Sequence, residues 1–489
     1  MPEKDQRELR IEKLAALKAQ GKDPYPARVR YTHTAAQALA AFERAAEGET
    51  VQVAVVGRLM SARVMGKSTF AHIADGSGRI QIYLRQDLLG EASYDFFRKM
   101  IDVGDFVAVE GRLFRTRTGE ITVEAESMDL ISKTLRPLPE KWHGLKDVET
   151  RYRQRYLDLL ANEEVRRIFV TRTRMITALR RFLDERGFLE VETPILQPIY
   201  GGAAARPFTT YHNALNRTLY LRIADELYLK RLIIGGFDRV YEIGHNFRNE
   251  GISTQHNPEF TVIEIYQAYA DYNDIMRLVE EIYAAVAQEV LGRLTLTYQG
   301  QEINLAAPWR RITMRQAILE HSGIDIELHR DYASLWAATQ ERGLTLTKQP
   351  TWGKLVDELF GETVQPTLIQ PTFVLDYPIE ISPLAKKKPD APHLVERFEY
   401  FIGGMECGNA FSELNDPLDQ RERFLAQRQA AGQGDEEAHP MDEDFLIAME
   451  HGMPPTGGLG FGIDRMAMLF TDQASIREVI LFPQLRSKE

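Results

Sequence analysis

Between residues 51 and 135, short runs alternate hydrophobic and polar positions, as in Val51-Val53-Val55, Ile80-Ile82-Leu84 and Ile121-Val123. Alternation with period two places one face of a strand against a core. Turns containing glycine, such as Asp75-Gly76-Ser77-Gly78, separate these runs. Several short strands at this spacing predict a small closed barrel of about five strands. Such barrels commonly bind single-stranded nucleic acid or oligosaccharide, and the pattern alone does not choose between the two.

Helical periodicity flanks the barrel region. Residues 5–20 carry a narrow apolar stripe, which indicates a surface helix packed on the body more readily than a helix dedicated to RNA. Residues 165–186 have the same period, and later segments mix the two periodicities. We expect helices near 225–234, 272–291 and 464–470, and strands at 239–243, 259–266, 398–403 and 457–462. This mixture predicts an α+β domain.

These patterns divide the chain into four parts. They are an N-terminal helical segment at 1–49, an all-β barrel at 50–135, a linker at 136–155 and a large α+β domain at 156–489. The linker begins at Arg136-Pro137-Leu138-Pro139, where alternate prolines favour extended backbone. A chain of 489 residues exceeds what one hydrophobic core usually organises, so several domains are expected.

Composition constrains the cellular setting more than the chemistry. The single cysteine, Cys407, excludes a disulfide framework and a cysteine-built zinc site within one chain. The charged N-terminus lacks the apolar core of a signal peptide, and no apolar run is long enough to cross a bilayer. We therefore expect a cytoplasmic protein with no membrane partner. The net charge of -11 argues weakly against indiscriminate binding of nucleic acid but does not exclude a local basic face.

Two glycine-containing segments differ in what they indicate. Residues 65–69 resemble the end of a phosphate-binding Walker loop, but Ser61 stands where that loop needs its first glycine. We therefore expect a hairpin turn there. Gly458, Gly460 and Gly462 share one face of a strand and leave that face bare for a flat ligand. A tightly packed sheet edge would explain the same glycines without a ligand.

Segment 240–266 contains several residues suited to binding a nucleotide. Arg248 and Glu250 would face the same side of a strand, and His256 and Phe260 follow a short polar loop. A strand, loop and strand would bring these side chains into one pocket. There an arginine can bind phosphate or carboxylate oxygens, and a phenyl ring can stack on a purine. Taken alone, a surface ion pair and a core phenylalanine explain them more simply.

Three carboxylates, Glu399, Glu406 and Glu413, recur among apolar residues and glycine. Glutamate is seldom fully buried unless it is paired or bound to metal. Magnesium is usually held by one or two carboxylates together with substrate phosphates. Each glutamate singly could be a structural ion-pair partner, but three in one apolar segment indicate a site.

Together these segments resemble the three signature motifs of class II aminoacyl-tRNA synthetases. Motif one corresponds to residues 186–196, motif two to 248–260 and motif three to 458–465. Within the class the chain resembles the bacterial lysyl-tRNA synthetases, with further matching stretches at 143–158, 201–208 and 227–232. The resemblance extends from about residue 50 to the end of the sequence.

The resemblance implies a catalytic domain built on an antiparallel sheet flanked by helices, and an N-terminal OB-fold barrel that binds the anticodon. It implies a homodimer joined through the motif-one region around Pro194. The substrates would be ATP, L-lysine and tRNA(Lys), with Mg2+ bound alongside ATP. Lysine would be activated to lysyl-adenylate with release of pyrophosphate, and then transferred to the 3′-terminal ribose of tRNA(Lys).

The resemblance also implies roles residue by residue. The catalytic residues would be Arg248 and Arg465. The ATP site would comprise Arg248, Glu250, His256, Phe260, Gly460, Gly462 and Arg465. Lysine would contact Gly202, Glu226, Arg248, Glu264, Tyr266, Asn409, Phe411 and Glu413. Magnesium would bind Glu399 and Glu406, and the anticodon would contact Arg63, Phe70, Gln81 and Glu120.

Four positions depart from the residues that are frequent in the family. Asp225 replaces a proline, His245 and Gln255 replace arginines, and Cys407 replaces an aliphatic residue. None of these changes removes a proposed catalytic group. Gln255 is expected to hold the ATP phosphates less strongly than an arginine would.

Three alternative functions are open: a synthetase for aspartate or asparagine, a lysine-activating enzyme that modifies a protein, and a non-catalytic RNA-binding paralogue. An acidic substrate side chain would need an arginine where this chain offers Tyr266 and Glu413. Protein-modifying relatives generally lack the barrel. A non-catalytic paralogue would not need to retain the predicted catalytic and metal-binding residues, which this chain keeps as Arg248, Glu399, Glu406 and Arg465.

Overall fold

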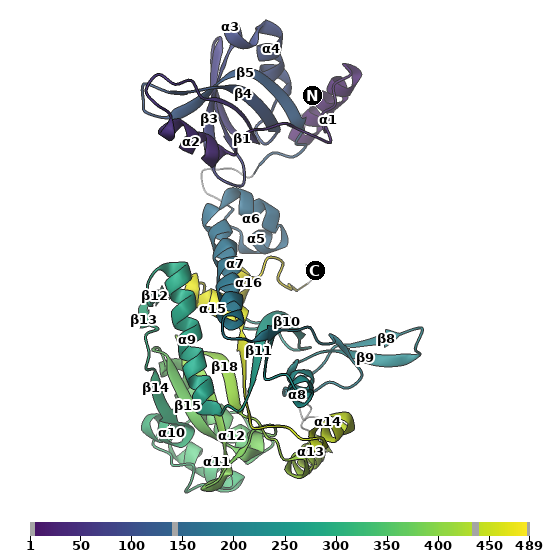
Figure 1. Cartoon of the computed structure of the whole chain (residues 1–489), viewed down its shortest axis with the longest axis vertical. Coiled ribbons are helices and arrows are strands. Elements are labelled where there is room, and N and C mark those ends of the chain that lie inside the picture. The colour runs from purple at the N-terminus through teal and green to yellow at the C-terminus, as the bar shows by residue number, and fades with distance from the viewer. Residues whose placement is uncertain (1–4, 139–144, 433–439, 487–489) are drawn as a thin grey trace. The chain divides into compact units, whose positions relative to one another are not determined.

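The computed structural model describes residues 5–138, 145–432 and 440–486. The chain forms two compact units, Met1–Gly144 and Leu145–Glu489, coloured from purple to blue and from blue to yellow in Figure 1. The predicted linker at 136–155 spans the boundary between them. Its residues Pro139 to Gly144, with which the matching stretch at 143–158 also begins, lie outside the described part of the chain. The last part of the predicted linker forms helix α5 (Val148–Arg153).

The first unit contains a closed barrel with the strand order β1-β2-β3-β5-β4. Its elements are α1 (Gln6–Ala19), α2 (Ala35–Arg44), β1 (Gln52–Met65), β2 (Ser68–Ala74), β3 (Arg79–Arg85), α3 (Gln86–Leu89), α4 (Glu91–Met100), β4 (Phe106–Arg115) and β5 (Ile121–Ser132). Alternate residues such as Val53, Val55 and Ile80 fill its core, so the predicted barrel is confirmed. Gly66 and Lys67 form the turn between β1 and β2, which confirms the hairpin in place of a phosphate-binding loop.

A buried ion cluster joins the end of β5 to the turn before β4. Lys133 Nζ lies 2.7 Å from Asp105 Oδ2, and both side chains are fully buried. The same nitrogen lies 2.5 Å from Asp102 Oδ2, and the Thr134 N–H donates to Asp105 Oδ1 at 2.7 Å. Buried charges are tolerated when they are paired and hydrogen-bonded. These contacts therefore hold the end of β5 against the start of β4.

The second unit is built on a nine-stranded sheet with the order β14-β15-β17-β18-β19-β11-β10-β6, in which β16 pairs with β17. Neighbouring strands are antiparallel, except that β14 runs parallel to β15 and β6 parallel to β10. A smaller sheet has the order β7-β9-β8, and β12 forms a hairpin with β13.

The strands of this unit are β6 (Leu189–Glu190), β7 (Leu196–Gln197), β8 (Thr209–His212), β9 (Arg217–Leu221), β10 (Arg239–Phe247), β11 (Glu259–Ala268), β12 (Thr295–Tyr298), β13 (Gln301–Asn304), β14 (Arg310–Thr313), β15 (Thr372–Pro378), β16 (Lys387–Lys388), β17 (Ala391–Ile402), β18 (Met405–Ser412) and β19 (Thr456–Gly462). The α-helices after α5 are α6 (Arg155–Ala161), α7 (Glu163–Asp184), α8 (Glu226–Ile234), α9 (Tyr272–Leu291), α10 (Met314–Ser322), α11 (Tyr332–Glu341), α12 (Trp352–Thr363), α13 (Pro417–Gly432), α14 (Glu443–Glu450), α15 (Ile463–Phe470) and α16 (Ile476–Val479). Within the described residues, no helix combines the length and apolar character needed to cross a membrane.

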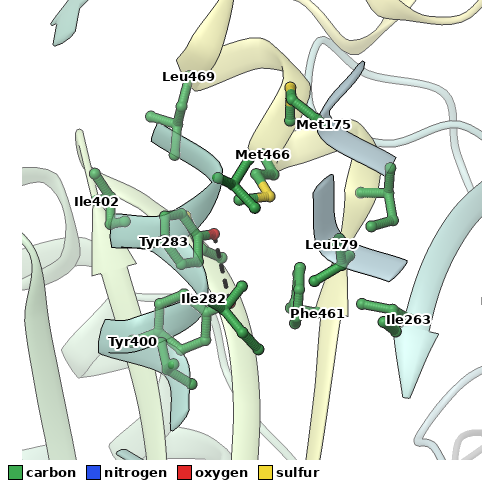
Figure 2. Close-up of a cluster of buried hydrophobic side chains, with 14 of the residues drawn as sticks. Met175, Leu179, Ile263, Ile282, Tyr283, Tyr400, Ile402, Phe461, Met466 and Leu469 are labelled. Atoms are coloured by element: carbon green, nitrogen blue, oxygen red, sulfur yellow. Dashed lines mark hydrogen bonds between the residues drawn. The ribbon is translucent and has the colours of Figure 1, made fainter. Parts of the chain in front are cut away.

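Helices α7, α9 and α15 cover one face of the large sheet. Figure 2 shows Leu179 of α7, Tyr283 of α9 and Met466 of α15 packed with Ile263 of β11 and Phe461 of β19. These helices bury their apolar stripes against the apolar face of the strands, as a two-layer core requires. The predicted α+β domain with a separate all-β barrel is therefore confirmed.

The opposite face of the sheet carries polar and aromatic side chains. Ile263 and Ile265 of β11 lie in the core that the helices cover. Glu264 lies between them and Tyr266 follows them, so these two side chains face away from that core. On β17, Glu399 occupies the same kind of position beside Tyr400, which is a core residue. The strand alternation thus directs these polar side chains away from the core that α7, α9 and α15 cover.

Truncating one core side chain tests the helix-covered face. Ile282 of α9 is fully buried, and we expect Ile282→Ala to lower the free energy of unfolding by about 2–5 kcal/mol because it leaves a cavity. Leu328, 76% exposed, is a matched control whose alanine variant should change stability by less than about 0.5 kcal/mol. Urea unfolding of the full chain, followed by intrinsic fluorescence and far-UV circular dichroism, measures both. Equal losses in the two variants would contradict this packing.

Candidate active site

A cavity of about 360 Å³ lies on the face of the sheet that Glu264 and Tyr266 share. Strands β10, β11, β17, β18 and β19 and the loops beside them contribute its walls. It is lined by every residue that the sequence predicted for ATP, lysine or magnesium: Gly202, Glu226, Arg248, Glu250, His256, Phe260, Glu264, Tyr266, Glu399, Glu406, Asn409, Phe411, Glu413, Gly460, Gly462 and Arg465.

Strand β11 sets the length of this cavity. Phe260 and Tyr266 both line it, and a rise of about 3.3 Å per residue places them roughly 20 Å apart along the strand. On the neighbouring strand β19, Gly462 is paired with Val262, close to Phe260, and Gly458 is paired with Tyr266. The cavity therefore has a Phe260 end and a Tyr266 end, and the two differ in charge.

At the Phe260 end, Arg248 has an unsatisfied donor. Its guanidinium carbon lies 5.2 Å from the centre of the Phe260 ring. Burial lowers the pKa of Arg248, although attraction to Glu250 and Glu406 opposes the shift. Arg248 Nε is buried without a hydrogen-bond partner among the described residues. An unpaired buried donor is costly, and a phosphate or carboxylate oxygen would satisfy it.

The prediction that Arg248 and Glu250 lie on a strand is wrong. Strand β10 ends at Phe247 and β11 begins at Glu259, so both residues belong to the connecting loop. The Glu250 N–H donates to the Arg248 carbonyl at 2.9 Å, which makes a tight three-residue turn. The Arg248 N–H donates to the Pro258 carbonyl at 2.9 Å and joins the two sides of the loop. The turn, not strand alternation, directs these side chains into the cavity.

Arg465 connects three parts of the Phe260 end. Its Nη1 donates to the Glu406 carbonyl at 2.5 Å and lies 3.3 Å from Glu406 Oε2. Its Nη2 lies 3.4 Å from His256 Nε2, and Ser253 Oγ lies 2.9 Å from His256 Nδ1. Burial and then repulsion from Arg465 lower the pKa of His256. The imidazole is therefore neutral at pH 7 and adds no third positive charge beside the arginines.

The pKa values of Glu399 and Glu406 are shifted in opposite directions. Glu399 accepts hydrogen bonds from Arg397 Nη2 at 2.6 Å and from the Tyr377 hydroxyl at 2.9 Å. Burial raises the pKa of Glu399 to about 7, with Glu406 adding to the shift and Arg397 opposing it. Burial would also raise the pKa of Glu406, but attraction to Arg465 and further arginines lowers it.

These two carboxylates fit a divalent cation shared with phosphates. A cation between them would relieve the repulsion that helps to raise the pKa of Glu399. Among the described residues, no group of three or more His, Cys, Asp or Glu side chains could enclose a metal ion. A site of two carboxylates needs oxygens from a bound ligand to complete it, and magnesium is commonly held in that way.

The Tyr266 end is rich in buried carboxyl groups. The Tyr266 hydroxyl donates to Glu264 Oε2 at 3.0 Å. Lys230 Nζ lies 2.5 Å from Glu226 Oε1 and forms an ion pair with Glu413 Oε2. Burial raises the pKa of Glu413 well above its usual range, with Lys230 opposing the shift and Glu226 adding to it. This end is suited to a positively charged group.

Three residues that were not predicted from the sequence contact acidic side chains of the cavity. Lys230 lies four residues after Glu226 in a segment predicted to be helical, and that spacing was an available signal. Arg397 lies two residues before Glu399 on the same strand, so its position on the same face was also available. Tyr377 comes from β15, and nothing local in the sequence relates it to Glu399.

The motif-three glycines make room for the site's own side chains. A Cβ on Gly458 would lie 1.9 Å from Glu413 Oε1 and 2.6 Å from Tyr266 Cε1. The expected bare face is therefore filled at this position by protein. At Gly460 and Gly462 an added Cβ would meet its nearest side-chain atoms at 3.6 Å, an ordinary contact distance. Only this part of the strand leaves space for a flat ligand.

The residues predicted to bind the anticodon lie together on the barrel. Phe70 stacks on Tyr83 with ring centres 4.2 Å apart, and Arg63 is paired directly opposite Phe70 across β1 and β2. Gln81 Nε2 donates to Glu120 Oε2 at 2.7 Å. The neighbours of Phe70 on its strand point into the core, so Phe70 lies on the outer face and does not fill the barrel.

Comparison with known proteins agrees with this geometry. Residues 147–486 match the family described as tRNA synthetases class II (D, K and N), and residues 53–131 match the OB-fold nucleic acid binding domain. The chain belongs to the class II tRNA synthetases. The catalytic-domain match includes the strands that line the cavity, and the barrel is an OB-fold.

Relatives of this synthetase match along almost the whole chain. A lysine–tRNA ligase of Carboxydothermus hydrogenoformans is 56% identical over 98% of both chains. One of Pelotomaculum thermopropionicum is 58% identical over 98% of this chain and 95% of its own. One of Bacillus subtilis is 51% identical over 99% of this chain and 98% of its own.

The four departures from the family sequence lie in different surroundings in this synthetase. Gln255 and Cys407 line the cavity, whereas the His245 side chain is exposed outside it. Asp225 is buried beside the cavity, and its N–H lies 3.4 Å from Glu264 Oε1. A proline at this position would lack that N–H. Asn246 Nδ2 donates to Asp225 Oδ1 at 3.2 Å.

The thiol of this synthetase should be unreactive in the native state. Cys407 is 1% exposed, and burial raises its pKa to about 12. Because the thiolate is the nucleophile, we expect iodoacetamide at pH 8 to alkylate the native protein at least about 100-fold more slowly than the protein unfolded in guanidinium. Mass spectrometry over time measures both rates on the single cysteine of the chain. Rapid labelling of the native protein would contradict this environment.

Proposed function

We propose that the protein is a lysine–tRNA ligase that activates L-lysine with ATP and transfers it to tRNA(Lys). The names of the relatives support this substrate. The observation that carries the proposal is the buried pair of carboxyls, Glu226 and Glu413, at the Tyr266 end of the cavity. A buried carboxylate selects a cationic group strongly, because a neutral substrate would leave the charge unpaired.

The arginines are suited to hold the two anions that must react. We assign Arg248 to the lysine carboxylate and the α-phosphate of ATP. We assign adenine to the space between Phe260 and Arg465, with Glu250 at its amino group and His256 near the γ-phosphate. Gly460 and Gly462 form the wall beside the nucleotide. The unpaired Arg248 Nε and the position of its guanidinium over the Phe260 ring support this arrangement.

The proposed reaction has two steps and no covalent enzyme intermediate. The lysine carboxylate attacks the α-phosphorus of ATP, the bond to pyrophosphate breaks, and lysyl-adenylate forms. The 3′-terminal ribose hydroxyl of tRNA then attacks the acyl carbon, and AMP leaves. The first step needs orientation and charge neutralisation more than acid–base chemistry, which Arg248 and Arg465 supply. Magnesium held by Glu399 and Glu406 would neutralise further phosphate charge.

The lysine side chain would extend toward the Tyr266 end. We assign its ammonium to Glu226, Glu413 and Tyr266, and its α-amino group to Gly202 and Glu264. Asn409 and Phe411 would complete the wall of this subsite. A Cβ on Gly202 would lie 2.9 Å from Ala224 Cβ, and its φ of +88° favours glycine. That close approach supports a role for Gly202 in shaping the subsite.

We further propose a cytoplasmic homodimer joined through motif one around Pro194. The Thr193 hydroxyl donates to Glu242 Oε2 at 2.7 Å and ties this segment to β10. Leu189, Ile195 and Leu196 remain 45–47% exposed. Exposed apolar residues grouped on a well-held segment are typical of a protein interface.

Removing one carboxylate should separate lysine binding from ATP binding. Glu413→Gln keeps the shape of the side chain but removes its charge, so we expect the KM for lysine to rise about tenfold or more. The dissociation constant for ATP should change less than about threefold. Pyrophosphate exchange and ATP titration measure the two quantities. Similar losses in both would refute the assignment of Glu413 to the lysine ammonium.

Removing the Phe70 ring from the outer face of the barrel should weaken tRNA binding and leave amino-acid activation unchanged. We expect Phe70→Ala to raise the KM for tRNA(Lys) about 5- to 150-fold, the range that loss of one stacked base allows. Phe70→Trp keeps the stacking surface and is the matched control. Aminoacylation kinetics give the KM, and unchanged pyrophosphate exchange verifies the catalytic domain. An unchanged KM for tRNA would remove Phe70 from the anticodon site.

Pyrophosphate exchange with each amino acid in turn tests the function as a whole. Exchange that depends on lysine is expected, and exchange with aspartate or asparagine is not. A protein that exchanges with lysine but does not charge tRNA would be the protein-modifying alternative. Absence of exchange with lysine would overturn the proposed function.

A further inference from the structure

Lys230 is a buried cation at the Tyr266 end of the cavity. It lies on α8, and its side chain is 1% exposed. Its Nζ lies 2.5 Å from Glu226 Oε1, one helical turn earlier, and forms an ion pair with Glu413 Oε2. The Phe411 ring lies 5.4 Å from the same nitrogen. Lys230 therefore bridges the two carboxyls that the proposed function assigns to the substrate ammonium.

Lys230 stays charged in this environment. Burial alone would lower the pKa of Lys230, but attraction to Glu226 and Glu413 outweighs it and the pKa is raised. Two carboxylates and one ammonium leave one unit of negative charge among these three groups. Within the described residues, neither Glu226 nor Glu413 has another ion-pair partner, although Arg397 attracts Glu226 from a greater distance.

Other ionisable groups face this trio from neighbouring elements. Burial raises the pKa of Glu226, Lys230 opposes the shift, and Asp225 on the turn before α8 adds to it. Glu264 and Tyr266 of β11 complete the surroundings, and burial first, followed by the acidic groups, raises the pKa of Tyr266 far above its usual range. The Tyr266 hydroxyl is thus a neutral donor. The only cation in contact with these acids in the described part of the chain is Lys230.

Glu413 has spare capacity to accept a second cation. Its Oε2 is in the ion pair with Lys230, whereas its Oε1 is buried with no hydrogen-bond partner among the described residues. Gly458 leaves the space that this oxygen occupies, because a Cβ there would lie 1.9 Å from it. A carboxylate accepts at both oxygens. Because Glu413 lines the cavity, this oxygen can accept from an ammonium that packs against it.

Without Lys230 the same two carboxyls would not stay ionised. Like charges buried together cannot both ionise readily, so one of them takes up a proton. A protonated carboxyl presents a donor where an ammonium needs an acceptor. A variant that lacks the Lys230 charge would thus meet its cationic substrate with a mismatched hydrogen-bonding group.

We propose that Lys230 is a positioning and specificity residue, which favours the ionised forms of Glu226 and Glu413 and so provides one net negative charge for one substrate ammonium. This role rests on the proposed function, because it takes lysine to be the substrate. Lys230 does not touch the reacting atoms. It acts through the two glutamates.

The test compares the full-length enzyme with Lys230→Met by lysine-dependent pyrophosphate exchange between pH 6 and 9. We expect the KM for lysine of the variant to rise about tenfold or more at pH 7, because one buried partner has lost its counter-ion. This KM should fall as pH rises, because the carboxyl that is protonated in the variant then ionises. The wild-type KM should vary less than about threefold over the same range. The KM for ATP should stay within about threefold throughout.

A charge-matched double variant separates this role from simple loss of structure. Lys230→Met with Glu226→Gln again leaves one negative charge, on Glu413, so we expect it to regain part of the affinity for lysine and to lose the pH dependence. If Lys230→Met does not fold, the double variant is compared with the wild type, and a KM for lysine that changes with pH in the double variant overturns the proposal. A flat pH profile in Lys230→Met, or a double variant that binds lysine no better than the single one, would overturn the proposal. Absence of lysine exchange in the wild type would instead overturn the proposed function.

Discussion

Side chains on a strand point alternately to its two faces, and this constraint decides where the catalytic domain keeps its core and where it binds ligands. On β11, Ile263 and Ile265 bury themselves under the helices, while Glu264 and Tyr266 project into the cavity. On β19 the core residue Phe461 lies between two glycines that line the cavity. Shifting the register of either strand by one residue would exchange the two faces. The hydrophobic core therefore holds the active-site residues in place.

The alternation of side chains also places charged groups in a poorly hydrated cavity, where several acids are paired with cations. Arg397 with Glu399, Arg465 with Glu406 and Lys230 with two glutamates each place a cation beside an acid that lines the cavity. Removing one partner of such a pair costs more than the pair contributes. Yet an Arg248 nitrogen and a Glu413 oxygen remain without hydrogen-bond partners in the described residues. One is a donor and the other an acceptor, so a zwitterionic cationic amino acid complements both.

Features that depend on residues close together in the sequence could be predicted, whereas features that depend on contacts between distant segments could not be predicted from local patterns. The barrel was predictable because alternation and glycine turns are properties of neighbouring residues, and Gly66 and Lys67 form the expected turn. The gathering of Arg248, Phe260 and Arg465 needed resemblance to a family, since it joins segments about 200 residues apart. The conformation of the Arg248–Glu250 turn was missed, because strand alternation was extended past Phe247, where the strand ends. The role of Gly458 was missed as well, because Glu413 meets it only through strand pairing.

The two ends of the cavity carry different kinds of information about function. The Phe260 end, with Arg248 and Arg465, provides what adenylation of any carboxylate needs and so identifies the class. In the proposed function, the Tyr266 end discriminates among amino acids, because Lys230, Glu226 and Glu413 together carry one negative charge. A neutral side chain would leave that charge unpaired, and an acidic side chain would add a second. A single positive charge would balance it, so specificity would reside in α8 and in the residue that follows β18, and not in the signature motifs.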